Sequence, residues 1–160
     1  MSADPVDLVI DASVGTKWFV PEILSEQASL LLGDGFRCHV PVLFYTEVVQ
    51  AIWKKVRLRQ ELKDEDGRII CKRLLIMSLE IHPTNPVLEL AFDLALETGR
   101  TVYDCVYVAT AQTMACRLVT ADRRLYNAFQ GTPLASSLIW VADIPVQFAS
   151  RCDPGTGDHE

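Results

Sequence analysis

Two aspartates follow short apolar runs in the same way. One lies in "DLVIDASVG" at position 11, and the other in "RLVTADRRL" at position 122. A single aspartate after a strand is most often an Asx-turn or a helix N-cap. The repeated pattern favours one explanation for both. Ser13 can already cap the helix that follows Asp11, and Asp122 lies two residues after Thr120 in the same way, which leaves the carboxylates free for chemistry.

Glu47 is a third candidate acid, in the helical segment "FYTEVVQAIW". Its neighbours one turn away, Leu43, Phe44 and Ala51, are apolar, and none of them is a cation. An ordinary glutamate at the edge of such a face reaches solvent. If the face is inward, the charge needs a cation or a proton, because burying an unpaired carboxylate costs several kcal/mol. Both readings stay open from this segment alone.

Asp104 is the fourth candidate acid, and its local pattern has an explanation of its own. In "TVYD" Thr101 fits a helix N-cap and Asp104 the third helical position of a capping box. Capping alone would account for the aspartate. A helix N-terminus can also present an acid to a metal or a phosphate, so the two roles are compatible.

The residue types restrict the chemistry. No histidine is placed as a catalytic base: His39 falls inside an expected strand, His82 precedes a proline and His159 lies near the C-terminus. That argues against Ser-His-Asp and Cys-His sites. Neither a Walker A motif nor GxGxxG occurs. Several carboxylates without a histidine or thiolate suit the hard cations Mg²⁺ and Mn²⁺.

The acids are positioned by alternating short apolar runs and longer segments of helical period. Strands separated by helices imply right-handed crossovers and a parallel sheet covered on both faces. The expected fold is α/β, a three-layer α/β/α sandwich with a central, mostly parallel sheet of four to five strands. Ligands of such sheets bind outside the carboxyl ends of the strands, where Asp11 and Asp122 would lie. Strands are expected at 7–11, 37–41, 79–83, 117–120 and 138–141, and helices from 13 to 32 and at 42–59, 63–78, 87–97, 102–115 and 123–129.

Bulk properties indicate a single domain over residues 1–150 with a disordered tail at 151–160. We expect a soluble, cytoplasmic protein without a leader or a membrane span, because the first residues are acidic and no apolar run is long enough. The five cysteines lack zinc spacing and lie mostly among apolar residues, as reduced core thiols do. The net charge of −6 includes three acids of the tail, so it does not exclude a polyanionic substrate.

Taken together, four segments resemble the PIN-domain ribonuclease family, especially the VapC-type toxins of toxin–antitoxin pairs. They are "VIDASV", "VPVLFYTEVVQAI", "TVYDCVYVATAQ" and "RLVTADRRL", in this order and spacing. The resemblance implies a metal-dependent endoribonuclease, with RNA as substrate, a small antitoxin as partner and a homodimer as assembly. It also implies one or two Mg²⁺ or Mn²⁺ ions, and cleavage that leaves a 5′-phosphate and a 3′-hydroxyl. The implied acidic quartet is Asp11, Glu47, Asp104 and Asp122, with Ser13 and Thr120 as supporting polar residues.

Within that quartet, Asp11, Asp104 and Asp122 are expected to hold the cations, while Glu47 binds one or orients a water. Some relatives carry a further acid after the fourth, but here Leu125, Tyr126 and Asn127 follow, which leaves the number of metal ions open.

Positive side chains flank these acids and could hold RNA, although a run of charge is as often only a solvated face. Lys54 and Lys55 lie two helical turns, roughly 11 Å, beyond Glu47, a suitable distance for a neighbouring phosphate. The candidate RNA-binding residues are Lys54, Lys55, Arg57, Arg73 and Arg123.

Three other functions compete with the nuclease. A phosphoaspartyl hydrolase of the haloacid-dehalogenase type needs D-x-D after the first strand, whereas this chain has Asp11-Ala12-Ser13. A response-regulator receiver needs adjacent acids near the first strand and a lysine after a late strand, and neither is present. A non-catalytic PIN-fold module that binds RNA or protein stays open as the alternative.

Overall fold

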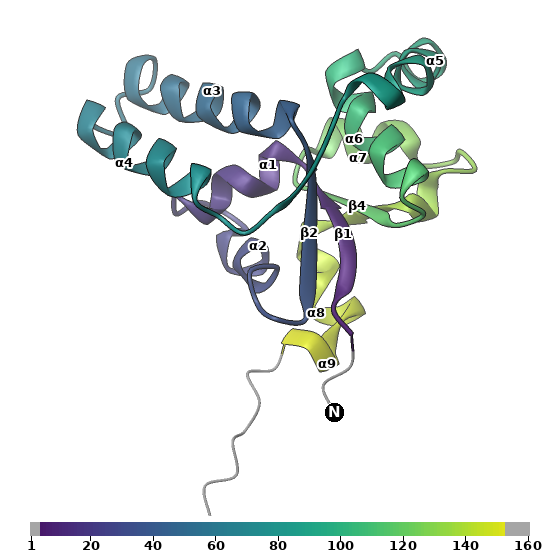
Figure 1. The fold of residues 1–160 in the computed structure, drawn as a ribbon, viewed down its shortest axis with the longest axis horizontal. Coiled ribbons are helices and arrows are strands. Elements are labelled where there is room, and N and C mark those ends of the chain that lie inside the picture. The colour runs from purple at the N-terminus through teal and green to yellow at the C-terminus, as the bar shows by residue number, and fades with distance from the viewer. Residues whose placement is uncertain (1–3, 153–160) are drawn as a thin grey trace, which may run out of the picture.

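The computed structural model describes residues 4–152, and over this range the chain forms a five-stranded, all-parallel sheet (Figure 1). The strand order is β3-β2-β1-β4-β5. Helices lie on both sides of the sheet, so the expected three-layer α/β architecture is confirmed. The strands are β1 (Val6–Ile10), β2 (Phe36–Pro41), β3 (Glu80–His82), β4 (Arg117–Thr120) and β5 (Leu138–Trp140).

The central strands are apolar on both faces because both faces are covered. Val9 and Ile10 of β1 and Val119 of β4 have no exposed surface. Such continuous apolar runs are typical of parallel strands between two helical layers. The sequence pattern therefore predicted these strands to within one residue at most ends.

The helices divide into two groups around the sheet. On one side α3 (Leu43–Arg57) and α4 (Asp64–Leu75) run beside each other as a hairpin (Figure 1). On the other side α5 (Leu88–Thr98) pairs with α6 (Val102–Thr113), and α6 packs on β1, β2 and β4. Gly99 joins α5 to α6 in the left-handed conformation, with φ of 68°, and ends α5 as its glycine predicted.

The strand order reverses between β1 and β4. Strands β2 and β3 lie on one side of β1 in the sheet, and β4 and β5, which follow β3 in sequence, lie on the other side. The carboxyl ends of β1 and β4 are therefore neighbours, and a hydrogen bond of 3.0 Å from the Asp11 amide to the Val119 carbonyl joins them. This reversal is where open parallel sheets bind ligands.

The helix expected from residue 13 to 32 is wrong in detail. The segment divides into α1 (Ala12–Gly15), a 3₁₀ turn (Thr16–Trp18) and α2 (Ser25–Leu30). Pro21 and Leu24, whose φ is 69°, both interrupt helical hydrogen bonding. Ser13 is not the N-cap either, since it lies inside α1. Asp11 occupies the cap position, and its side chain accepts no capping hydrogen bond from the amides of α1.

Three short α-helices follow β4: α7 (Arg123–Phe129), α8 (Ile144–Gln147) and α9 (Ala149–Cys152). Further 3₁₀ turns lie at Asn85–Val87, Ala135–Ser137 and Val141–Asp143. The helices α8 and α9 were missed by periodicity because each is about one turn long. The tail predicted from residue 151 begins inside α9, and its remainder, 153–160, lies outside the described residues. No helix within residues 4–152 has the length and apolarity of a membrane span.

Candidate active site

The four candidate acids line one pocket of about 180 Å³ at the carboxyl edge of the sheet. Each comes from a different place in the fold: the residue after β1, the second turn of α3, the first turn of α6 and the residue before α7. Ser13 and Thr16 of the first helical turns contribute to the same wall. We call this the acid pocket, and its acids are Asp11, Glu47, Asp104 and Asp122.

Asp11 is the most buried of the four acids, with 6% of its surface exposed. Its Oδ2 accepts hydrogen bonds from the Ser13 hydroxyl at 2.5 Å and from the Thr120 hydroxyl at 2.8 Å. Burial nevertheless raises the pKa of Asp11 to about 7, and the nearby charges of Glu47 and Asp104 add to the effect. Metal-free, this carboxylate is an unfavourable buried charge that a cation would stabilise.

The two hydroxyls beside Asp11 also tie the ends of β1 and β4 together. Ser13 Oγ accepts from the Ala121 amide at 3.0 Å, and Thr120 Oγ1 accepts from the Asp122 amide at 3.0 Å. The supporting positions expected for Ser13 and Thr120 therefore lie directly at the acid pocket, with contacts to both strand ends.

Glu47 is half-buried and lines the pocket. Its Oε2 accepts a hydrogen bond of 2.5 Å from the hydroxyl of Tyr107, a buried residue of α6. Burial raises the pKa of Glu47, and the charge of Asp104 raises it further, while the tyrosine bond opposes them. Helix α3 comes close enough because Gly15 faces it: a Cβ at Gly15 would overlap the Phe44 ring.

Asp104 has both features that the sequence suggested. Thr101 caps α6 by accepting from the Asp104 amide at 3.1 Å, which confirms the cap. The Asp104 carboxylate does not return to the Thr101 backbone; its Oδ2 accepts from Arg100 Nη2 at 2.8 Å. Arg100 Nε is buried without a hydrogen-bond partner among the described residues, so Arg100 is only partly satisfied.

Asp122 corrects one expectation. Its carboxylate is not free, because it caps α7: Oδ1 accepts from the amides of Arg124 at 2.8 Å and Leu125 at 3.2 Å. Both bonds use Oδ1. The capping interpretation of a strand-end aspartate therefore holds here, and Oδ2 is the oxygen left for the pocket.

The donor set fits a hard divalent cation. It consists of carboxylate oxygens, and the raised pKa values of Asp11 and Glu47 record the repulsion and burial that a cation would relieve. Within residues 4–152, however, no three acidic, histidine or cysteine side chains already converge as a metal site. The hydrogen bonds from protein donors use one oxygen of each carboxylate: Oδ2 of Asp11 and Asp104, Oε2 of Glu47 and Oδ1 of Asp122. The second oxygen of each acid is left for a cation.

The basic candidates divide by position. Lys54 and Lys55 lie next to the acid pocket, but Lys55 is buried and bonded to carboxylates, so it is not an open RNA contact. Arg57 faces α4 and pairs with Asp64 at 3.4 Å. The other two stack on aromatic rings outside the pocket, Arg73 over Phe19 and Arg123 over Trp140.

Sequence reasoning missed Tyr107 and Arg100 as neighbours of the acids. Tyr107 lies three residues after Asp104, on the same face of α6, so helical spacing could have identified it. Arg100 lies four residues before Asp104, the spacing of an ion pair on a helix, but it precedes the N-cap.

Comparison with known proteins places this site in a family. The PIN domain family model matches residues 8–129. Ribonuclease VapC3 of Pyrobaculum aerophilum is 37% identical over 124 residues, covering 76% of this chain and 94% of the relative. Ribonuclease VapC12 of Mycobacterium tuberculosis is 30% identical over 118 residues, covering 74% and 88%.

Solved structures agree on the fold. A Pyrobaculum aerophilum crystal structure matches with a TM-score of 0.61 at 24% identity, over 91% of this chain and 90% of the other. A toxin–antitoxin complex from Klebsiella pneumoniae matches with a TM-score of 0.57 at 16% identity, over 84% and 97%. With its acid pocket at the β1/β4 switch point, the chain belongs to the PIN-domain family and, within it, to the VapC ribonucleases.

Proposed function

We propose that this chain is a metal-dependent endoribonuclease that hydrolyses RNA at the acid pocket and acts as the toxin of a type II toxin–antitoxin pair. The observation that carries the proposal is the convergence of four carboxylates, from elements up to 111 positions apart, in one pocket. Similarity to the VapC ribonucleases supports RNA as the substrate.

Each acid has a proposed role in this reaction. Asp11, Asp104 and Asp122 would hold Mg²⁺ or Mn²⁺. When bound, such a cation lowers the pKa of a coordinated water and stabilises charge on the phosphoryl oxygens. Glu47, held by Tyr107 through one oxygen, orients the attacking water or takes its proton. The expected products carry a 5′-phosphate and a 3′-hydroxyl.

The experiment is RNA cleavage by the purified protein with Mg²⁺ or Mn²⁺, with and without chelator. Asp104→Asn should lower the cleavage rate at least about a hundredfold while the protein stays folded, because the amide loses the charge that binds a hard cation. Thr101→Ala is the matched control: it removes the cap of the same helix, so it should lower stability by about 1 kcal/mol and keep cleavage.

Wild-type activity in Asp104→Asn would refute this assignment. RNA binding without cleavage by the wild type, at any Mg²⁺ or Mn²⁺ concentration, would favour the non-catalytic module instead.

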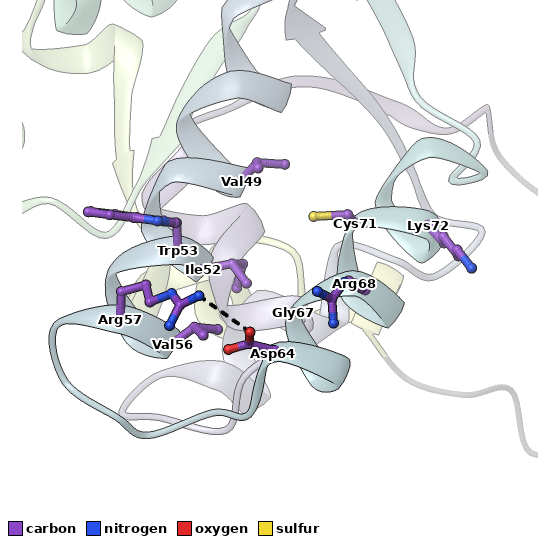
Figure 2. Close-up of a pocket in the computed structure, with 10 residues that line it drawn as sticks. All are labelled: Val49, Ile52, Trp53, Val56, Arg57, Asp64, Gly67, Arg68, Cys71 and Lys72. Atoms are coloured by element: carbon purple, nitrogen blue, oxygen red, sulfur yellow. Dashed lines mark hydrogen bonds and ion pairs between the residues drawn. The ribbon is translucent and has the colours of Figure 1, made fainter.

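We propose further that the antitoxin docks in the apolar groove between α3 and α4. Figure 2 shows Val49 of α3 and Cys71 of α4 pointing into the space between the two helices. Trp53 and Val56 of α3 also line this groove, which has a volume of about 500 Å³. The Trp53 ring points away from α4 in Figure 2 and is 48% exposed, so a large aromatic ring is uncovered at the rim of the groove. An amphipathic helix lays its apolar face into such a groove. The matched Klebsiella pneumoniae structure is named as a toxin–antitoxin complex, which supports an antitoxin as partner.

Co-purification tests the groove. The protein would be co-expressed with the product of any short, antitoxin-like reading frame found just upstream of its gene. Trp53→Glu should abolish capture of that small protein, while Ile76→Glu, at an exposed residue outside the groove, should retain it. Equal capture by both variants would place the antitoxin elsewhere.

We also propose that the chain forms a homodimer through helix α5. Leu88, Phe92 and Leu96 form a stripe along α5 at four-residue spacing, and each is at least 43% exposed. A contiguous apolar stripe of this kind is characteristic of a protein interface. We assign the dimer contact to this stripe.

A further inference from the structure

A second cavity of about 540 Å³ opens beside the acid pocket and shares Ser13, Glu47 and Asp122 with it. From these shared residues it extends along α3 past Gln50 to Lys54 and Arg59. We call this cavity the cationic groove. Because the two cavities share walls, a chain molecule bound over the acids continues directly into the groove.

The cations of α3 are sorted by the helix into two faces. Lys54 lines the cationic groove, whereas Arg57, three residues later, lines the apolar groove on the α4 side and pairs with Asp64. Arg59 returns to the side of Lys54 because the chain turns at the helix end, where the Arg59 amide donates to the Lys54 carbonyl at 3.0 Å. Lys54, Arg57 and Arg59 are close in sequence, but the fold directs Lys54 and Arg59 to one groove and Arg57 to the other.

Two other lysines of the groove are already neutralised. One carboxylate, Glu22, bridges them: its Oε1 accepts from Lys17 Nζ and its Oε2 from Lys55 Nζ, each at 3.0 Å. Lys55 also donates to Glu61 at 3.0 Å. These lysines build the wall of the groove. Arg59 also pairs with Glu61, at 3.9 Å, but its side chain is 62% exposed. Contact with a mobile anion therefore falls to the two exposed cations, Lys54 and Arg59.

The lining also indicates which part of a nucleic acid fits. No aromatic side chain among the described residues lines the cationic groove, so it offers no platform on which bases could stack. Beside the carboxylates of Glu22, Glu47 and Asp122, the lining offers amine, guanidinium and amide groups, and these contact phosphate and sugar oxygens. The groove therefore suits a single-stranded sugar–phosphate backbone without reading its bases.

We propose that the cationic groove holds the RNA strand beside the cleaved bond, with Lys54 and Arg59 each contacting a phosphate. This inference rests on the proposed ribonuclease function. It adds the path of the bound strand over the surface, which runs along α3 from Glu47 toward Arg59. Lys54 lies two helical turns from Glu47, about 11 Å along the axis, so its phosphate is a neighbour of the cleaved one.

Salt-dependent binding tests the groove. The probe is a short, mixed-sequence, fluorescein-labelled single-stranded RNA, with Ca²⁺ in place of Mg²⁺ and a gel to show that the RNA stays intact. For single strands each phosphate contact contributes about 0.7 to the slope of log K against log salt concentration. Lys54→Gln and Arg59→Gln should each reduce the slope by about 0.7, and the double variant by about 1.4.

Arg57→Gln is the matched control, because it removes the same charge from the opposite face of the same helix. It should leave the slope unchanged. A slope reduced as much by Arg57→Gln as by Lys54→Gln, or an unchanged slope in the double variant, would overturn the groove assignment. If the wild type still cleaves RNA with Mn²⁺, that failure concerns the groove alone; if the wild type neither binds nor cleaves RNA, the proposed function fails as well.

Discussion

At the scale of single residues, the four acids differ in what holds them. Asp11 is bonded to two hydroxyls, Glu47 to a tyrosine, Asp104 to an arginine and Asp122 to backbone amides. Only the arginine brings a full positive charge. The metal-free site therefore keeps most of its negative charge close together, and this excess makes it suited to a cation.

The raised pKa of Asp11 predicts how the stability of the metal-free protein depends on pH. Its pKa is about 7 in the folded protein against an ordinary value of 3.8, so the folded state binds the proton more tightly. The protonated residue costs nothing extra below pH 3.8, and the penalty grows as pH rises to about 7, reaching roughly 4 kcal/mol. Metal-free melting temperatures of Asp11→Asn should therefore exceed those of the wild type by more at pH 8 than at pH 5. An equal difference at both pH values would contradict the raised pKa.

The position of Glu47 among the other acids predicts that its negative charge lowers metal-free stability and supports metal binding. Glutamine keeps an oxygen that accepts from Tyr107 but removes a charge near Asp104. Glu47→Gln should therefore leave metal-free stability unchanged or raised, and it should lose the stabilisation that Mn²⁺ confers on the wild type. Thermal melts with and without Mn²⁺ measure both effects. The same Mn²⁺-induced shift in the two proteins would remove Glu47 from the site.

At the scale of elements, Lys55 connects three segments. It extends from α3 to Glu22 in the loop before α2 and to Glu61 in the turn before α4, with both distances at 3.0 Å. These bonds hold one wall of the cationic groove. Gly15 has a matching role near the other end of α3, where its missing side chain lets α1 pack on Phe44.

Lys55 and Lys54 should therefore differ in stability although they are adjacent. Lys55→Met leaves two carboxylates without their buried partner and should cost about 1–3 kcal/mol. Lys54→Met, at an exposed residue, should change stability by less than about 0.5 kcal/mol. Urea denaturation of both variants gives the comparison. Equal stabilities would mean that Lys55 is only a surface cation.

At the scale of the whole molecule, α3 separates two surfaces. One side forms the cationic groove beside the acids, and the other forms the apolar groove against α4. The exposed stripe of α5 belongs to the opposite helical layer (Figure 1). Substrate, antitoxin and a second copy of the chain can thus each contact a different part of the surface.

The stripe on α5 predicts the oligomeric state. A charge at Leu96, which is 70% exposed, would be buried without a partner in a dimer. Leu96→Glu should therefore give a monomer of unchanged fold by light scattering, whereas Ile23→Glu, 84% exposed and outside α5, should not change the wild-type mass. A dimeric Leu96→Glu protein would exclude this interface.

Local pattern was enough to predict the fold and the family of this protein. Apolar runs ending in Asp11 and Asp122 predicted strands β1 and β4, and Thr101 predicted the cap of α6, because each depends on neighbours within a few positions. The match to the PIN domain and VapC ribonucleases confirms the family resemblance read from the same segments.

Only the tertiary structure decided which charges are engaged. Lys54 and Lys55 look alike in sequence, but one step around a helix turns a side chain by about 100°, and it brings Lys55 alone to Glu22, 33 positions away. Tyr107 reaches Glu47 across 60 positions in the same way. Such partners depend on how helices pack, and side-chain packing across the fold is not encoded in the spacing of any one segment.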